Sequence, residues 1–120
     1  MAHILIVDDS PQDVETIKTI LEGQGHKISV AQDGESGIQR AQELHPDAVV
    51  MDIVMPGTDG FKATRKITKG ADTKGIPVIL LSSKNLESDR AWGLMSGGTE
   101  YLVKPVKPDE LLDTVSKVLG

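Results

Sequence analysis

Acidic, hydroxyl and basic side chains follow four of the five short apolar runs in this 120-residue sequence. In chain order they are Asp8-Asp9, Asp52, Ser82-Ser83 and Lys104. If the runs form parallel strands, their carboxyl ends meet at one edge of the sheet, which is where open α/β sheets bind ligands. We therefore expect three carboxylates, two hydroxyls and one ammonium group to lie close together.

Three neighbouring carboxylates repel one another, so the pKa of at least one should rise unless a cation binds. Mg²⁺ is a hard cation that proteins hold with one or two carboxylates, waters and phosphate oxygens. A carboxylate in such a site can attack phosphorus as a nucleophile. Lys104 and Ser82 would then donate hydrogen bonds to phosphoryl oxygens. The set therefore predicts a Mg²⁺-dependent site that accepts a phosphoryl group.

Each member of this set also has an ordinary structural explanation when it is taken alone. Asp8-Asp9 and Ser82-Ser83 could each cap the helix that follows them. Asp52 could belong to an ordinary loop, and Lys104 could be a solvated lysine. Their placement after four strands, in this order, is what argues against coincidence.

Five apolar runs at nearly even spacing predict the strands that carry these residues. They are Ile4–Val7, Ile28–Val30, Ala48–Met51, Val78–Leu81 and Tyr101–Val103. Four of them are nearly continuous, which is typical of strands covered on both faces. The second alternates between apolar and polar residues and predicts an edge strand.

Segments with helical periodicity lie between these strands. The clear apolar repeats are Val14-Ile17-Leu21, Ile38-Ala41-Leu44 and Leu111-Leu112-Val115-Val118-Leu119. Weaker repeats predict helices over about 61–69 and 86–96. Gly93 destabilises the second of these by about 1 kcal/mol relative to Ala, so we expect that helix to be mobile. The alternation predicts one doubly wound α/β domain over residues 1–120, with a parallel sheet and helices on both faces.

The composition excludes several classes of function. There is no cysteine, which excludes disulfides, zinc-thiolate sites and thiol catalysis. With 18 acidic residues against 13 Lys plus Arg, the net charge of −5 disfavours nucleic-acid binding. The longest apolar stretch, Ile76–Leu81, is too short to span a bilayer, and no signal-peptide pattern is present. We therefore expect a soluble cytoplasmic protein with no membrane insertion and no separate output domain.

Four segments of the sequence resemble the response-regulator receiver domains of two-component signalling, and the resemblance covers residues 3–119. The segments are Ile4–Ser10, Met51–Gly60, Pro77–Ser83 and Tyr101–Pro105. The resemblance implies a flavodoxin-like fold with strand order 2-1-3-4-5 and five helices. The pair Trp92-Gly93 also resembles the stand-alone receivers of chemosensory systems that control type IV pili and twitching.

The resemblance assigns phosphoryl acceptance to Asp52, with a sensor histidine kinase as the donor. Asp9 would ligate Mg²⁺ directly, and Asp8 would do so through water. The Asp52 carboxylate and the Val54 carbonyl would complete the protein ligands. Val54 and Lys84 occupy positions that influence water access to the acyl phosphate in this family.

The resemblance also implies a conformational switch. Ser82 and Lys104 would each bind a phosphoryl oxygen, and Tyr101 would turn inward as Ser82 moves towards the phosphate. Most family members have a cis peptide before the matching proline, so we expect a cis Lys104–Pro105 bond. Phosphorylation would bias an existing equilibrium between two states.

Output would pass to a downstream protein target through the face formed by the fourth helix, the fifth strand and the fifth helix. Trp92 and Met95 are three residues apart on the expected fourth helix, so they share a side. With Tyr101, they form a candidate partner surface. The alternative is that Trp92 packs on the core.

Two other functions stay open. A pseudo-receiver would bind a partner without being phosphorylated, although such domains typically lose the acceptor, the lysine or an acidic residue, and this chain has all of them. A Mg²⁺-dependent phosphohydrolase of the haloacid-dehalogenase type would place its nucleophile after the first strand and a general acid two residues later. In this chain that second position is Ser10. We therefore expect a signalling protein that assists its own phosphorylation and dephosphorylation, and not a metabolic enzyme.

Overall fold

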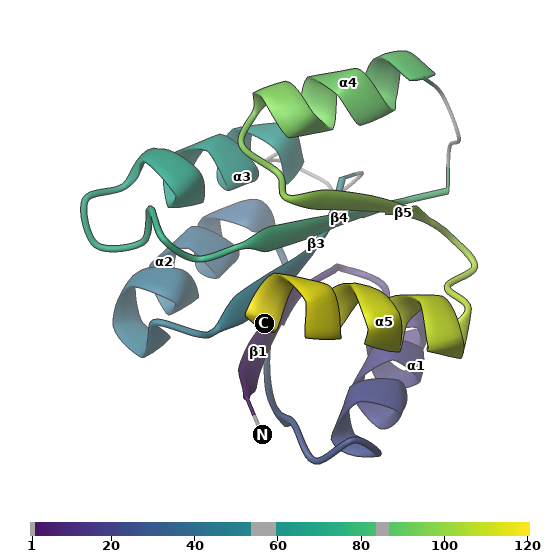
Figure 1. The fold of residues 1–120 in the computed structure, drawn as a ribbon. Helices are drawn as coiled ribbons and strands as arrows, with labels where there is room; N and C mark the ends of the chain where they lie inside the picture. Colours follow the sequence, from purple (N-terminus) through teal and green to yellow (C-terminus); the bar gives the residue numbers. More distant parts are fainter. Residues whose placement is uncertain (1, 54–59, 84–86) are drawn as a thin grey trace.

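A parallel sheet of five strands lies at the centre of the described chain, and helices cover both of its faces (Figure 1). The computed structural model describes residues 2–53, 60–83 and 87–120. The strands are β1 (His3–Val7), β2 (Lys27–Ala31), β3 (Ala48–Asp52), β4 (Val78–Ser82) and β5 (Glu100–Val103). The helices are α1 (Pro11–Glu22), α2 (Gly34–Leu44), α3 (Gly60–Lys69), α4 (Glu87–Met95) and α5 (Pro108–Leu119). No helix within these ranges is long and apolar enough to cross a membrane.

The strand order is β2-β1-β3-β4-β5, which confirms the doubly wound, flavodoxin-like fold. β2 lies at one edge of the sheet, as its alternating sequence predicted. β5 forms the other edge, yet Tyr101 and Leu102 are buried because each packs into the core on a different face of the sheet. An edge strand can therefore have a nearly continuous apolar sequence when helices cover both of its sides.

Successive residues of each inner strand enter two separate hydrophobic clusters. On β1, Leu5 and Val7 belong to the cluster under α2 and α3, whereas Ile4 and Ile6 belong to the cluster under α1 and α5. Neighbouring side chains of a strand point to opposite faces. A strand covered on both faces therefore needs an apolar residue at every position, which explains the continuous run Ile4–Val7.

The ends of α1 follow from local backbone chemistry. The Ser10 hydroxyl caps its start and accepts a hydrogen bond from the Asp13 backbone N–H at 3.3 Å. The helix ends at Gly23, and the following turn contains Gly25 with φ of +87°, a conformation that favours glycine. The start of α1 matters for the site described below, because it carries Asp13 towards the edge of the sheet.

Gly93 lies buried where α4 packs against the sheet. A Cβ atom at this position would lie 2.5 Å from Leu80 Cδ1 and within 3.5 Å of the rings of Phe61 and Tyr101. Glycine therefore lets α4 approach β4 closely. The mobility of α4 stays a prediction, but Gly93 also has a packing role that depends on its neighbours in space.

Gly60 offers a test of how tightly the end of β3 is packed. Its N–H donates to the Ile53 carbonyl at 2.9 Å, and an added Cβ would meet the Asp52 carbonyl oxygen and lie 2.6 Å from Ile53 Cα. We expect Gly60→Ala to lower the free energy of unfolding by about 1–3 kcal/mol, measured by urea denaturation. Gly75→Ala is the matched control, because a Cβ there would meet nothing within 4 Å. Equal stability of the two variants would contradict this account.

Candidate functional site

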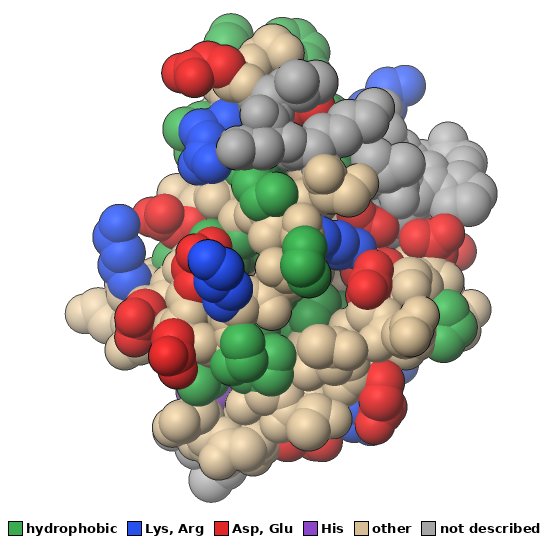
Figure 2. All heavy atoms as spheres, turned by 90° about the vertical axis from the view of Figure 1, so that its right-hand side faces the viewer, with side chains coloured by type: hydrophobic (Ala, Val, Ile, Leu, Met, Phe, Trp, Pro, Cys, Tyr) green, Lys and Arg blue, Asp and Glu red, His purple; other side chains and the backbone are tan. Residues whose placement is uncertain are grey.

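The carboxylates of Asp8, Asp9 and Asp52 meet at the carboxyl ends of β1 and β3, as the sequence predicted. Each offers an oxygen atom, and these atoms lie within 4.8 Å of one another. The register pairs Val7 with Met51, so the next residues along the two strands are also neighbours. We call these three residues the acidic triad. Figure 2 views this edge and shows acidic side chains gathered around a basic one.

Asp8 is held firmly at the end of β1. Its backbone N–H donates to the Ala31 carbonyl at 3.1 Å, which continues the pairing of β1 with β2. Its Oδ1 atom accepts a hydrogen bond from the Ser10 N–H at 2.9 Å. Asp8 and Asp52 are buried, whereas Asp9 is exposed. The triad therefore has two carboxylates fixed in the protein and one at the solvent.

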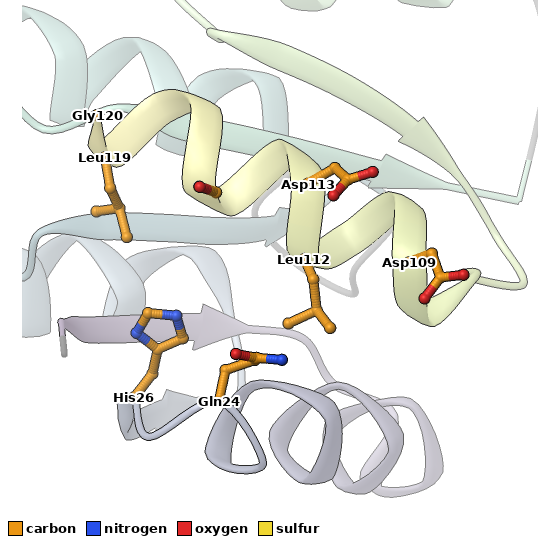
Figure 3. Close-up of a pocket in the computed structure, with 8 residues that line it drawn as sticks. Gln24, His26, Asp109, Leu112, Asp113, Leu119 and Gly120 are labelled. Carbon is orange, nitrogen blue, oxygen red and sulfur yellow. The ribbon is translucent and has the colours of Figure 1, made fainter.

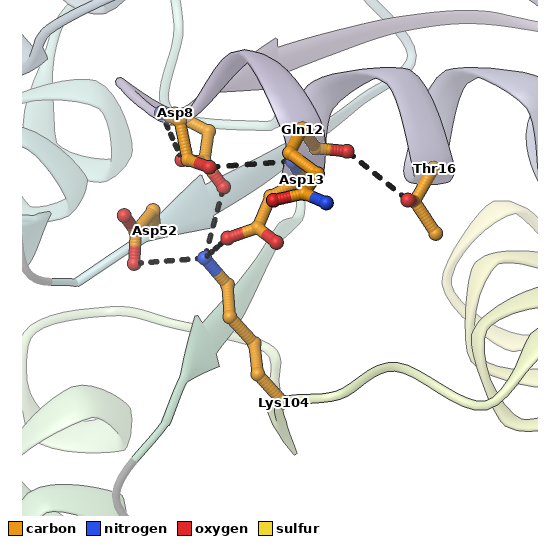
Figure 4. A network of polar contacts seen from close by, with 7 residues as sticks. Asp8, Gln12, Asp13, Thr16, Asp52 and Lys104 are labelled. Atoms are coloured by element: carbon orange, nitrogen blue, oxygen red, sulfur yellow. Dashed lines mark hydrogen bonds and ion pairs between the residues drawn. The ribbon is translucent and has the colours of Figure 1, made fainter.

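Lys104 places its ammonium group among these carboxylates. Its backbone N–H donates to the Ser82 carbonyl at 2.7 Å, and the Lys104–Pro105 peptide bond is cis, as expected. Its Nζ atom lies 3.0 Å from Asp8 Oδ2 and 3.5 Å from Asp52 Oδ1 (Figure 4). The lysine side chain is largely buried. The structure thus brings together the acidic and basic residues that the sequence placed at separate strand ends.

The pKa of Lys104 reflects a balance between burial and charge. Burial by itself lowers this pKa, because it disfavours the charged ammonium form. Hydrogen bonds to Asp13 and Asp8, together with the charges of Asp52 and Asp8, outweigh the burial. The pKa of Lys104 is therefore raised above its ordinary value, and the side chain is a cation at neutral pH.

Asp13 is a member of the site that reasoning from the sequence missed. Its Oδ2 atom lies 2.8 Å from Lys104 Nζ, which is shorter than the distances from this nitrogen to Asp8 and Asp52. Asp13 lies in the first turn of α1, and that helix begins directly after the Asp8-Asp9 pair. The short spacing between Asp9 and Asp13 was the signal that could have placed it at the same edge.

Ser82 and Tyr101 lie on neighbouring strands in the core. Ser82 ends β4, is buried, and pairs in register with Val103 of β5. The guanidinium of Arg90 lies 4.9 Å from the centroid of the Tyr101 ring, and its Nη1 atom donates to the Tyr101 carbonyl at 3.4 Å. Tyr101, expected on the partner surface, is instead buried in this structure because its ring packs against the sheet under α4.

The outer side of α4 exposes large apolar side chains. Trp92 is 52% exposed and Met95 is 75% exposed, so Trp92 does not pack on the core. Leu94, which the sequence did not single out, is 48% exposed. Val54 and Lys84, whose roles were inferred from the resemblance, lie outside the described residues.

A hollow of the surface lies between the end of α1 and the adjoining side of α5 (Figure 3). Gln24, His26, Asp109 and Leu112 are among the residues that line it. The lining contains neither a member of the acidic triad nor Lys104. This hollow is therefore separate from the site formed by the acidic triad and Lys104.

The donor set of the acidic triad fits Mg²⁺. All of the ligand atoms are carboxylate oxygens, which are the hard donors that this ion prefers, and they are close enough to share one cation. Asp9 is exposed, so this side of the triad faces the solvent. Asp8, Asp9 and Asp52 are therefore the residues that would hold the ion.

Comparison with known proteins gives a consistent result. The family profile described as "Response regulator receiver domain" matches residues 4–116. The protein PilH of Pseudomonas aeruginosa is 48% identical over 120 residues, which cover 100% of this chain and 99% of PilH. The chain also resembles longer relatives, such as the DNA-binding response regulator MtrA of Mycolicibacterium smegmatis (38% identity over 113 residues), of which it spans 48%.

Solved structures give the same result for the fold. The chemotaxis protein CheY4 of Vibrio cholerae is 30% identical, with a TM-score of 0.93 and 99% of both chains covered. The receiver domain of the sensor histidine kinase PA1611 from Pseudomonas aeruginosa has a TM-score of 0.92 at 32% identity, covering 99% of this chain and 98% of that one. The PA1611 structure holds a magnesium ion coordinated in its active site cleft.

Removing the Lys104 ammonium group tests whether it compensates the carboxylates. We expect Lys104→Met to lower the free energy of unfolding at pH 7 by about 1–3 kcal/mol, because Asp8 and Asp52 would face each other without their cation. Since folding raises the pKa of Lys104, its contribution is complete below the ordinary lysine pKa of about 10.4 and is lost as the pH rises through the raised value.

Urea denaturation at several pH values checks this prediction. The difference between wild type and Lys104→Met should stay constant between about pH 7 and 9 and shrink only above about pH 10.4. Lys107→Met is the matched control, because Lys107 is exposed and makes no side-chain capping bond to α5. A difference that shrinks between pH 7 and 9 would mean that another group is responsible.

Proposed function

We propose a function from one premise, which is that this chain belongs to the response regulator receiver domain family. It accepts a phosphoryl group on Asp52 from a sensor histidine kinase and signals to a downstream protein through a conformational change. One observation carries this proposal. The buried Asp52 carboxylate lies beside two further carboxylates within 4.8 Å and 3.5 Å from the Lys104 ammonium group.

The proposed reaction is an in-line transfer. An oxygen atom of the Asp52 carboxylate attacks phosphorus, the bond from phosphorus to the kinase imidazole breaks, and its electron pair returns to the imidazole nitrogen. When Mg²⁺ is bound, it supplies positive charge towards the phosphoryl oxygens. Lys104 faces the Asp52 carboxylate before transfer, and it would donate to a phosphoryl oxygen afterwards. Asp8 is fixed by the Ser10 N–H, so it holds its orientation throughout.

The proposed switch runs along β4 and β5. Ser82 is buried at the end of β4 and would turn its hydroxyl towards the phosphoryl group on Asp52. Tyr101 lies on the adjoining strand, in the core under α4, where its position depends on the packing around it. Phosphorylation adds contacts that exist in only one state, which is what shifts a two-state equilibrium.

The proposed output surface is the outer side of α4 with the adjoining β5 and α5. Trp92 and Met95 are both at least half exposed there, and a protein partner would bury them. The match along nearly all of PilH supports a receiver of the PilH kind. Nucleic-acid binding is not part of this proposal, because the chain carries a net charge of −5.

Asp52→Asn tests the acceptor. We expect intact-mass spectrometry to show a single phosphoryl adduct on the wild-type protein after incubation with acetyl phosphate and Mg²⁺, and no adduct on the variant, because an amide is a poor nucleophile. Asp72→Asn is the matched control, since Asp72 is exposed in a turn and should be labelled like wild type. Undiminished labelling of Asp52→Asn would refute the acceptor assignment.

The same experiment separates the alternative functions. A wild-type protein that forms no adduct with any small donor, and shows no change with beryllofluoride, would be a binding module that works without phosphorylation. Turnover of a generic phosphomonoester would instead show a phosphohydrolase. Omitting Mg²⁺ should abolish the adduct, which checks that the acidic triad works with a cation.

Lys104→Ala tests the switch separately from phosphorylation. We expect this variant to accept some phosphate, because Asp52 is still present, but to lose the response of Trp92 fluorescence to beryllofluoride. The single tryptophan of the chain lies half exposed on α4, so its emission reports on that helix. Lys107→Ala, which alters an exposed lysine, should respond as wild type does. A normal fluorescence response in Lys104→Ala would contradict the role of this lysine.

A further inference from the structure

Lys104 has a carboxylate partner that does not belong to the acidic triad. Its Nζ atom lies closer to Asp13, at 2.8 Å, than to Asp8, at 3.0 Å. Figure 4 shows the Lys104 ammonium group lying between two sets of carboxylates. Asp8 and Asp13 are on one side, next to α1, and Asp52 at the end of β3 is on the other. Asp13 is not one of the acidic residues whose oxygens converge to form a candidate metal site. Its closeness to Lys104 therefore needs a separate explanation.

A divalent cation in the triad would compete with Lys104. Both Asp8 and Asp52 are predicted ligands of the ion, and both also face the lysine ammonium group. Two positive groups a few ångströms apart repel each other strongly where water is partly excluded. An ammonium group has three N–H donors, so it can turn towards whichever anions are available. Asp13 is a nearby anion that is not among the predicted ligands of the divalent cation.

We propose that Asp13 is a positioning residue that holds the Lys104 ammonium group at the rim of the triad, so that a divalent cation and Lys104 occupy the site together. This inference rests on the proposed function, because it concerns the cation of the same site. Without Asp13, the donors of Lys104 turn to Asp8 and Asp52 and compete with the cation for their oxygens.

The surroundings of Asp13 suit this role. Its backbone N–H donates to the Ser10 hydroxyl, and the Ser10 N–H donates to Asp8, so the residues that face Lys104 from the α1 side are tied together. The Asp13 side chain is 43% exposed, which keeps it outside the buried part of the triad. A hollow beside the pair is lined by Gln12, Asp13, Thr16, Lys104 and Pro105, among others. The contact between Asp13 and Lys104 therefore lies beside open space and not inside the packed core.

The binding of Mg²⁺ alone, without any phosphoryl donor, tests the inference through a double-mutant cycle. MgCl₂ is titrated into wild type, Asp13→Asn, Lys104→Ala and the combined variant, and dissociation constants are taken from amide shifts in ¹H–¹⁵N NMR spectra. We expect Asp13→Asn to weaken binding about fivefold and Lys104→Ala to strengthen it. In the Lys104→Ala background, Asp13→Asn should change binding by less than about twofold, because the competing ammonium group is gone.

Two further variants separate this role from a general effect of charge. Glu15→Gln removes one negative charge from the exposed side of the same helix, and we expect it to leave Mg²⁺ binding within about twofold of wild type. Asp13→Glu keeps the carboxylate and should recover most of the affinity that Asp13→Asn loses. Urea denaturation without metal confirms that each variant is folded.

The outcomes are distinct. Equal weakening by Asp13→Asn in both backgrounds would mean that Asp13 acts only as one more negative charge, and stronger binding would mean that it does not restrain Lys104; either result overturns the inference while leaving the proposed function intact. A wild-type protein that binds no Mg²⁺ would overturn both.

Discussion

The ammonium group of Lys104 balances the charge of the carboxylates that the sheet brings together at the ends of its strands. Asp8 and Asp52 are both buried, and neighbouring buried carboxylates are unfavourable unless a cation and hydrogen bonds accompany them. The strand order puts these two residues side by side, and β5, which is separated from β1 by β3 and β4, brings the lysine back to them. The placement of this cation among its anions is the condition on which the edge of the sheet depends.

The backbone of Lys104 also connects the site to the surface of the molecule. The backbone N–H of Lys104 donates to the Ser82 carbonyl, so the pairing of β4 with β5 extends into the site itself. Tyr101 lies on the same short strand and packs under α4, whose outer side carries Trp92. A change in the partners of Lys104 can therefore reach α4 through a short series of packed groups.

Periodicity predicted the strands well because each inner strand is covered on both faces. The run Ile4–Val7 shows this, since its residues are divided between two cores. The convergence of Asp8, Asp9 and Asp52 was predictable for a related reason, as parallel strands end at a common edge. At Gly93, helix propensity describes only an isolated helix, whereas in the folded chain the Leu80 side chain leaves no room for a Cβ.

The sequence by itself determined the alternation of strands and helices, the edge position of β2 and the strand ends at which charged residues gather, because these follow from local patterns of apolar and polar residues. Only the tertiary structure decided which carboxylate lies nearest to Lys104 and that Tyr101 is buried while Trp92 is exposed. Asp13 and Lys104 are separated by 91 positions in the chain. Such a contact depends on how a helix and a distant strand pack against each other, and no local spacing in the sequence encodes that arrangement.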